Sequence, residues 1–389
     1  MPCNMLLAPV MSAATSTSRV ESPPPISLLR PRMPELDTLR GIAVLLVLFF
    51  HGFGFEFGTQ GLHGIPKLFV AATLPGWAGV NLFFVLSGFL ITGILLDTKD
   101  RLDYFRRFYY RRALRILPIY YAVLIALAVL SRIGFISRPA SWSFLGLSAI
   151  YLANMTELFG VPMQYGVLWT LAIEEHFYLI WPTVVHRISR RKVAIAGLAI
   201  FIFCALLRYY YCVKGYDAGH GYTWLYADGL ALGAILAAIA RGAWGTRTAM
   251  KTIAALVLAG SLAMFALGAP GIFLASHRIG MVLRPTVLNL FFAGVVMLFL
   301  LIGTSRWQWL VNRPLLKFFG EISYGVYLIH MLMFDIVDRW MPASVSGLAD
   351  TKWRFEFMLL HFFLGAGLTI VVAYLSRRHF EEFFLRLKN

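Results

Sequence analysis

The chain has 389 residues, of which 59% are hydrophobic and 14% are charged, and its mean hydropathy is +0.72. This composition excludes an ordinary soluble domain and predicts an all-α, polytopic membrane helix bundle. The formal net charge of +16 would favour a nucleic-acid partner in a soluble protein. Here the basic residues lie in short segments between apolar stretches, where they orient the chain in lipid, so we expect membrane lipid and no nucleic acid as partners. The three cysteines, Cys3, Cys204 and Cys212, have neither disulfide nor metal spacing, and we predict no metal site.

The first 34 residues differ from the rest, because they are rich in proline, serine, threonine and alanine. They lack the charged segment and apolar run of a signal peptide, so we predict a disordered cytoplasmic tail over 1–34 and a transmembrane domain over 35–389. Ten stretches of this domain are long and apolar enough to span a bilayer. They are 39–57, 76–96, 116–133, 167–186, 193–212, 223–240, 252–268, 283–303, 319–338 and 356–375. A further stretch at 143–153 is too short to cross and is expected at the interface.

The basic residues are distributed unevenly between the two sides that ten spans define. Most of the 35 lysines and arginines fall on the side of the N-terminus, including the run from Lys99 to Arg115. Because cytoplasmic loops carry the excess of positive charge, both termini are predicted to be cytoplasmic. If 143–153 were a span, every later loop would change side and the bias would disappear.

The first predicted span carries two ionisable residues, Arg40 and His51. At 100° per residue they lie within roughly 20° of the same helix face, about 16 Å apart along the axis. A neutral imidazole inside the membrane is available as a base, which makes His51 a candidate general base. The alternative role is a hydrogen bond that holds two helices together.

Further ionisable residues are predicted at a similar depth, about 5–12 Å from the outer surface. They are Glu174 and Glu175 in the fourth span, Asp228 in the sixth, His330 in the ninth and His361 in the tenth. We expect them to converge on one cavity, where a carboxylate orients His51. Glu174 is the first choice for that role and Glu175 the second, since neighbouring helix positions diverge by 100°. The structural alternative is an ion pair with an arginine such as Arg208.

A basic, aromatic segment precedes the third span. Its Arg112 and Arg115 are three residues apart and share a helix face, and guanidinium groups suit phosphate oxygens. The segment is therefore a candidate phosphate site on the cytoplasmic side, although a positive membrane anchor is the simpler explanation. In the second span, Ser87 and Gly88 indicate close helix packing, and Ser87 is a weak candidate nucleophile without a neighbouring base in sequence.

Taken together, these segments resemble the acyltransferase 3 family of membrane acyltransferases, and the motifs occur in the family's order. The family's hallmark of an arginine, ten residues and a histidine matches Arg40 and His51. The other matching stretches are GVNLFFVLSGFLI at 79–91, RRALRILPIYY at 111–121, WTLAIEEHFYLIWP at 169–182, ISYGVYLIH at 322–330 and the closing motif at 380–385. The resemblance covers about residues 34–387. It has two minor departures: Thr170 replaces the usual serine, and the closing motif lacks its proline.

The resemblance implies transfer of an acyl group, most often acetyl, from cytoplasmic acyl-CoA to a hydroxyl of a carbohydrate or other small acceptor. It also implies a stand-alone membrane domain in a bacterial cytoplasmic membrane, and it leaves the oligomeric state open, a homo-oligomer included. We expect Arg40, Arg112 and Arg115 to bind the coenzyme A phosphates. His51 would act as general base or be acylated itself. The remaining predicted cavity residues are Ser87, Trp169, Asp228, Tyr327 and His330.

Two other classes of protein fit parts of the pattern. A proton-coupled secondary transporter also places His, Glu and Asp at mid-membrane, but it typically has repeated halves, and this sequence has no internal repeat. A non-catalytic membrane scaffold would bind no acyl-CoA and would lose no chemical product when His51 is changed.

Overall fold

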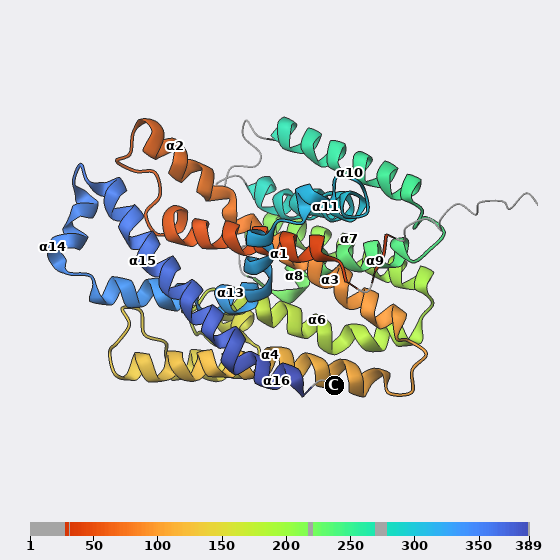
Figure 1. The fold of residues 1–389 in the computed structure, drawn as a ribbon, viewed down its shortest axis with the longest axis horizontal. Coiled ribbons are helices and arrows are strands. Elements are labelled where there is room, and N and C mark those ends of the chain that lie inside the picture. The colour runs from red at the N-terminus through yellow and green to blue at the C-terminus, as the bar shows by residue number, and fades with distance from the viewer. Residues whose placement is uncertain (1–27, 31, 217–220, 269–277, 388–389) are drawn as a thin grey trace, which may run out of the picture.

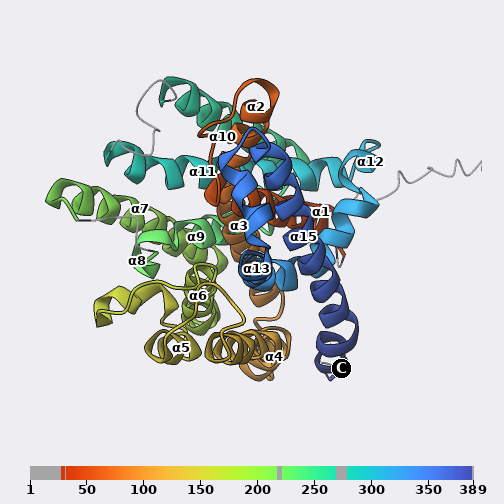
Figure 2. The ribbon, with the colours of Figure 1, turned by 90° about the vertical axis from the view of Figure 1, so that its left-hand side faces the viewer.

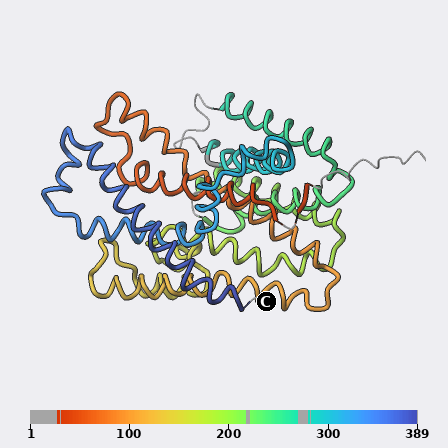
Figure 3. Tube along the Cα trace, in the orientation of Figure 1, coloured from red at the N-terminus to blue at the C-terminus, as the bar shows by residue number. Residues whose placement is uncertain are grey.

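The computed structural model describes residues 28–30, 32–216, 221–268 and 278–387, and within these ranges every regular element is a helix. Most of the predicted tail, 1–34, lies outside the described residues. The long helices run mainly along the long axis of the molecule (Figures 1 and 3). The fold is therefore the predicted all-α bundle.

Each of the ten predicted spans is helical in the structure. The long helices are α1 (Pro34–Phe49), which continues as the π-helical turn η1 (Phe50–Phe55), α3 (Gly79–Asp97), α4 (Tyr104–Arg132), α6 (Leu168–Arg187), α7 (Arg190–Lys214), α9 (Asp228–Ala240), α10 (Arg247–Gly268), α11 (Arg278–Gly303), α13 (Pro314–Trp340) and α15 (Arg354–Leu375). The short helices are α2 (Gly64–Thr73), η2 (Leu74–Ala78), α5 (Trp142–Ala149), η3 (Ala153–Phe159), α8 (Thr223–Tyr226), α12 (Gln308–Val311), α14 (Ala343–Ser346), η4 (Gly347–Asp350), η5 (Ser376–Glu381) and α16 (Glu382–Arg386).

Eight helical segments of the described chain are long and apolar enough to cross a membrane, which makes this a multi-pass membrane protein. The predicted count of ten included α6 and α9, which fall outside those eight. The first carries two glutamates and a histidine in mid-helix, and the second has 13 residues. Ten of the 13 residues of α9 are buried, as expected for a helix that is apolar on all sides and enclosed by others.

Glycines bring the central helices of Figure 2 into backbone contact. A Cβ atom on Gly320 of α13 would lie 2.0 Å from the carbonyl oxygen of Asp37 in α1, and one on Gly41 would lie equally close to that of Leu316. Small residues at helix interfaces allow such close approach in membranes. This contact holds α1 and α13, the two helices that carry Arg40 and His330, side by side.

The second span packs in the same way against α9. A Cβ on Gly88 would lie 2.0 Å from the carbonyl oxygen of Leu230, and one on Gly233 would lie 2.1 Å from that of Val85. The packing interpretation of Gly88 is therefore confirmed.

The bundle has two different ends. We call the end that holds the first residues of α1 and α4 the basic end, because Arg40 and the basic segment from Arg106 to Arg115 lie there. The opposite end, here the loop end, carries the connections 56–63, 133–141, 150–167 and 341–353. The predicted interfacial stretch forms α5 at the loop end, and its eight residues are too few to cross a bilayer.

Candidate active site

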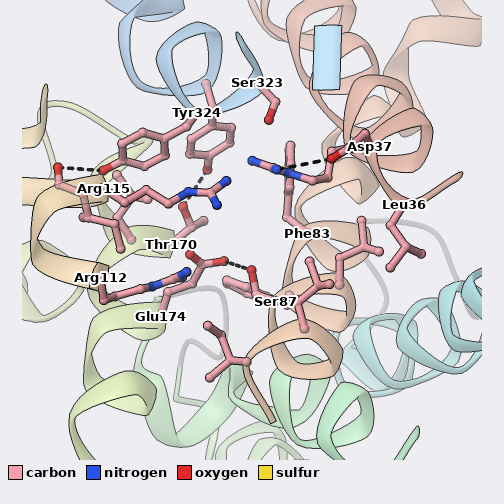
Figure 4. Close-up of a pocket in the computed structure, with 18 of the residues that line it drawn as sticks. Leu36, Asp37, Phe83, Ser87, Arg112, Arg115, Thr170, Glu174, Ser323 and Tyr324 are labelled. Atoms are coloured by element: carbon pink, nitrogen blue, oxygen red, sulfur yellow. Dashed lines mark hydrogen bonds and ion pairs between the residues drawn. The ribbon is translucent and has the colours of Figure 1, made fainter. Parts of the chain in front are cut away.

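A cavity of about 600 Å³ extends from the basic end into the bundle between α1, α3, α4, α6 and α13 (Figure 4). We call it the arginine cavity. Its charged lining residues are Arg32, Asp37, Arg40, Arg112, Arg115 and Glu174. Four arginines against two acids give the wall a net positive charge. It therefore suits an anionic ligand, and guanidinium groups match phosphate oxygens in particular.

The arginines of this cavity are only partly neutralised. Arg40 lies 3.8 Å from the Asp37 carboxylate, and the Arg112 guanidinium lies 3.9 Å from the centre of the Tyr178 ring. Among the described residues, no carboxylate forms an ion pair with Arg112 or Arg115. Figure 4 shows both guanidinium groups directed toward the same space as Glu174 and Ser87. Guanidinium groups that no carboxylate pairs can bind the oxygens of an anionic ligand.

Hydroxyl groups also line the arginine cavity. Ser87 donates a hydrogen bond of 2.8 Å to Oε1 of Glu174, so the serine that lacks a base in sequence has one in space. The Thr170 hydroxyl lies 2.6 Å from the Tyr327 hydroxyl, and the Tyr327 ring packs edge-on against Phe83 at 5.7 Å. The Tyr327, Thr170 and Phe83 side chains all line the cavity.

Beyond Tyr327, two histidines from α13 and the π-helical turn meet. Nε2 of His330 lies 3.2 Å from Nδ1 of His51, and the two ring centres are 4.8 Å apart. Tyr327 and His330 are also ring neighbours, at 6.0 Å. His51 sits in a π-helical turn, a widened helix geometry that is frequent at functional sites.

Hydrogen bonds define the proton positions on these rings when both are neutral. Nδ1 of His330 lies 2.8 Å from the carbonyl oxygen of Tyr327 and 3.1 Å from that of Val326, so it carries the proton and its Nε2 is an acceptor. Nδ1 of His51 faces that acceptor and, at 3.0 Å, the carbonyl oxygen of Val47. It must therefore be the N–H group, which leaves Nε2 of His51 with a lone pair, as a general base requires.

His51 lines a second cavity of about 290 Å³ at the loop end, which we call the histidine cavity. Its other polar lining groups are Glu56, Arg138, Gln164, Tyr165 and Asp335. They come from the residue that follows the π-helical turn, from α13 and from the loops 133–141 and 160–167. Loops of the loop end thus complete this cavity, whereas helices enclose the arginine cavity.

Arg138 is the anchor of the histidine cavity. Its backbone N–H and Nε donate to the Asp335 carboxylate at 3.0–3.1 Å, and its terminal nitrogens reach Asp338 at 2.5 Å and Glu56 at 3.3–3.4 Å. Partial burial alone lowers the pKa of Arg138, but the surrounding carboxylates outweigh it and leave that pKa raised. One permanent cation therefore meets three carboxylates. Oδ1 of Asp338 in turn lies 2.7 Å from Nε2 of His361.

A third cavity, of about 430 Å³, adjoins the arginine cavity on the side of α4. The two share Arg112 and Arg115, and the third adds Arg107 and Arg111. The basic segment therefore turns arginines toward interior spaces as well as toward the membrane surface.

The structure joins many of the predicted site residues, but in two groups. Arg40, Arg112, Arg115, Ser87, Glu174 and Tyr327 line the arginine cavity, and His51 pairs with His330 beside the histidine cavity. Neighbouring positions of a helix diverge by 100°, and accordingly Glu174 lines the arginine cavity and Glu175 does not. The predicted contact between Glu174 and His51 is absent from the described interactions: Glu174 bonds Ser87 and His51 bonds His330.

The predicted convergence of the ionisable groups on one cavity was wrong, because they divide between two cavities and positions outside them. The loop before α6 folds into the bundle, where Val167 and Leu168 are buried and Tyr165 donates to the carbonyl oxygen of Leu328 at 2.8 Å. α6 therefore begins inside the protein, and Glu174, about two turns further on, lines the arginine cavity and not the space beside His51.

Asp228, Trp169, His330 and His361 also differ from the prediction, since they line none of the three cavities. His330 instead contacts His51, which does line one. Asp228 is fully buried and accepts a 2.6 Å hydrogen bond from Arg208, which identifies it, rather than a glutamate of α6, as the partner of that arginine. Trp169 packs against Tyr226 at 5.6 Å. His361 bonds Asp338.

Sequence reasoning missed the residues that complete the histidine cavity: Glu56, Arg138, Gln164 and Asp335. Asp335 carried a usable signal, because it and Asp338 follow His330 on the same helix. Arg138 and Gln164 carried none, since both lie in loops whose fold determines where they point.

Comparison with known proteins gives the family. A family described as an acyltransferase domain matches residues 33–378. The peptidoglycan O-acetyltransferase OatA of Listeria monocytogenes is 32% identical over 170 residues, which are 39% of this chain and 24% of that protein. A Staphylococcus aureus protein named as a candidate O-acetyltransferase is 26% identical over 389 aligned residues, which cover 90% of this chain and 57% of the relative.

This chain therefore spans between a quarter and somewhat more than half of the length of these relatives. No solved structure matches. The family match covers nearly all of the described bundle, from the start of α1 into η5, and includes the histidine cavity and all of the arginine cavity except Arg32. The chain belongs to the acyltransferase 3 family.

Proposed function

We propose that this chain is an O-acetyltransferase that takes an acetyl group from cytoplasmic acetyl-CoA and transfers it to a hydroxyl of a carbohydrate or another small acceptor. The observation that carries the proposal is the pair of cavities. One is lined with arginines and opens at the basic end, and the other contains His51 and opens at the loop end. The positive-inside bias assigns the basic end to the cytoplasm, where acetyl-CoA is found.

The arginine cavity is suited to the donor. Arg40, Arg112 and Arg115 present guanidinium groups to one space, and the adjoining cavity adds Arg107 and Arg111 for the further phosphates of the nucleotide. The long pantetheine arm would then extend along α1, past Phe83 and Tyr327, toward His51. Arg40 and His51 face the same side of α1, as this path requires.

His51 supplies the base. Its Nε2 lone pair accepts the proton of the acceptor hydroxyl as that oxygen attacks the thioester carbonyl, and the carbon–sulfur bond breaks. The proton on His51 then passes to the coenzyme A sulfur, which leaves as the thiol. His330 holds the His51 ring through Nδ1, so that its Nε2 stays available for this step.

A covalent route through Ser87 is a second candidate that one observation favours. The Ser87 hydroxyl donates to the Glu174 carboxylate at 2.8 Å inside the arginine cavity, which is the arrangement of a nucleophile and its base. In that route the acetyl group would rest on Ser87 before transfer. Radiolabelled acetyl-CoA distinguishes the routes, because only the covalent one leaves label on denatured wild-type protein and none on Ser87→Ala.

The experiment that tests the proposal is coenzyme A binding and acetyl-CoA turnover by purified protein in detergent. Wild type should bind coenzyme A, Arg115→Ala should bind it weakly, and His51→Ala should bind it normally without chemistry. Arg306→Ala is a matched control, since Arg306 is an exposed arginine of the basic end that lines none of the three cavities. If neither wild type nor the control binds coenzyme A, the donor assignment fails, and proton-coupled uptake into vesicles becomes the assay for the transporter alternative.

A further inference from the structure

The charged groups that line the histidine cavity indicate which kind of ligand it can bind. Its wall contains two carboxylates, Glu56 and Asp335, and one guanidinium, Arg138. That guanidinium is already engaged by both acids and by Asp338, the next carboxylate outward. The charge at the cavity and its mouth is therefore negative, opposite to the sign of the arginine cavity.

Other cations of the loop end do not offset this charge within the cavity. The Arg339 guanidinium donates to the carbonyl oxygen of Gly134 at 3.1 Å, and Arg354 donates to those of Ala349 and Phe57 at 2.8 and 2.9 Å. Neither arginine lines the histidine cavity. Arg138 is thus the one arginine or lysine among the described residues that line the cavity, and carboxylates already engage it.

The remaining groups of the wall are suited to a ring with hydroxyls. The Gln164 carbonyl accepts the backbone N–H of Ser141 at 2.7 Å, which leaves its NH₂ group as a donor. The Tyr165 hydroxyl is engaged by the backbone of Leu328 and Leu332, so this residue offers its ring, as Phe55 does. Aromatic rings pack against apolar C–H faces, and carboxylates accept hydrogen bonds from hydroxyl and ammonium groups.

The volume limits the size of the bound part. About 290 Å³ is just below the range of roughly 300–1,000 Å³ that is typical of pockets for whole drug-sized ligands. One sugar ring would fit inside, and the rest of a longer acceptor would remain outside the mouth. Nε2 of His51 would meet a hydroxyl of the enclosed ring.

We propose that the histidine cavity binds one neutral or amino-bearing sugar ring of the acceptor and disfavours rings that carry a carboxylate or phosphate. The inference rests on the proposed function for calling this ligand the acceptor. It does not depend on the donor, so it can be tested in the absence of acetyl-CoA. Glu56 is the residue through which selectivity is best tested, because its bonds to Arg138 are the longest of the cluster.

The first test measures the charge of the cavity. In protein whose cysteines Cys3, Cys204 and Cys212 are replaced by alanine, a thiol is introduced at Met163, which lines the cavity, or at Ser346, which is exposed at the same end. Rates of modification by a cationic and an anionic methanethiosulfonate of similar size are compared at both positions. One unit negative charge at about 4 Å in water should speed the cation about fivefold and slow the anion about fivefold. The cation-to-anion rate ratio should therefore be roughly 25- to 30-fold higher at position 163 than at 346.

The change Glu56→Gln should lower the cation-to-anion rate ratio at position 163. Asp350→Asn, which removes an exposed acid of the same end, should leave the ratio at position 163 unchanged. High salt should also reduce the difference between the two positions, since it screens exposed charges. Equal ratios at 163 and 346 would overturn the proposal, whatever the enzyme does with acetyl-CoA.

The second test measures the ligand class. Modification at position 163 by an uncharged methanethiosulfonate is followed in the presence of methyl glucoside, methyl glucosaminide or methyl glucuronide, which differ mainly in charge. The neutral and amino sugars should slow the modification and the uronate should not. Equal protection by the uronate, or no protection by any of the three up to their solubility, would overturn the inference. Loss of coenzyme A binding would instead bear only on the proposed function.

Discussion

The two main cavities of this protein have opposite charge and are built in opposite ways. The arginine cavity lies among long helices and has four arginines and two acids in its wall. The histidine cavity is completed by loops and has two acids and one fully engaged arginine. Each cavity opens at its own end of the bundle, so a polyanionic donor and a neutral acceptor would approach from opposite sides.

Between the cavities lie Tyr327, His330 and His51, in contact one after the other. Tyr327 lines the arginine cavity and His51 lines the histidine cavity. The comparison therefore predicts that substitutions separate into three groups: those that affect chemistry, those that affect donor binding and those that affect the barrier between the two spaces.

The largest effect is expected for His51→Ala. A general base contributes about 10²–10⁴-fold, so acetyl transfer should fall at least about 100-fold while coenzyme A binding stays unchanged. Initial rates with acetyl-CoA and equilibrium binding of coenzyme A measure the two quantities. His63→Ala, an exposed histidine of the same end, should behave as wild type. A His51→Ala protein that turns over normally would remove the chemical role of the histidine cavity.

A second effect should be confined to the donor side. Arg115→Ala removes charge-assisted hydrogen bonds worth about 1.5–3 kcal/mol, so KM for acetyl-CoA should rise about 10- to 100-fold with a smaller change in kcat. Arg115→Lys should restore part of the loss, because it restores the charge without the planar fork. If KM for the sugar acceptor rises instead, the two cavities have been assigned in the wrong order.

The arginine cavity could be predicted from sequence and the histidine cavity could not, for a physical reason. Arg112 and Arg115 share a face because both lie on one helix, and helical periodicity fixes their relation before any fold is known. The same rule correctly placed Arg40 on the face of α1 that lines a cavity. It also identified Glu174, but not Glu175, as the glutamate of α6 that lines that cavity.

The position of a residue along the bundle was harder to predict than the helix face on which it lies. Glu174 was expected near His51 because α6 was assumed to begin at the membrane surface, and it begins within the bundle. Likewise Arg138 reaches Asp335 from a loop almost 200 residues away in sequence. Contacts of this kind depend on how loops fold back over helix ends, which no periodic pattern encodes.

An intermediate effect is expected for His330, which acts through His51. The His51 N–H faces two acceptors, the Val47 carbonyl oxygen and Nε2 of His330. His330→Leu removes the second, and loss of one such hydrogen bond, about 1.4 kcal/mol, corresponds to at most about tenfold in kcat. His330→Gln retains an acceptor near the same position and should recover much of the rate. Donor KM should be unchanged in both variants. Equal losses in the two variants would indicate a packing role for His330 instead.

The smallest effect is expected for Tyr327, at the boundary between the arginine cavity and the histidine cavity. Tyr327→Phe removes the hydroxyl that bonds Thr170 at 2.6 Å, at a cost of about 0.5–1.5 kcal/mol, and should loosen the boundary between the cavities. Water would then reach the thioester more often, so acetyl-CoA hydrolysis without acceptor should rise about threefold while acceptor-dependent transfer changes little.

Thr170→Val breaks the same hydrogen bond from α6 and serves as the matched variant. Because both substitutions remove one bond, they should raise hydrolysis by similar factors, and the double variant should add nothing further. Additive increases would show that the two hydroxyls act separately, and the boundary between donor and acceptor spaces would then have to lie elsewhere.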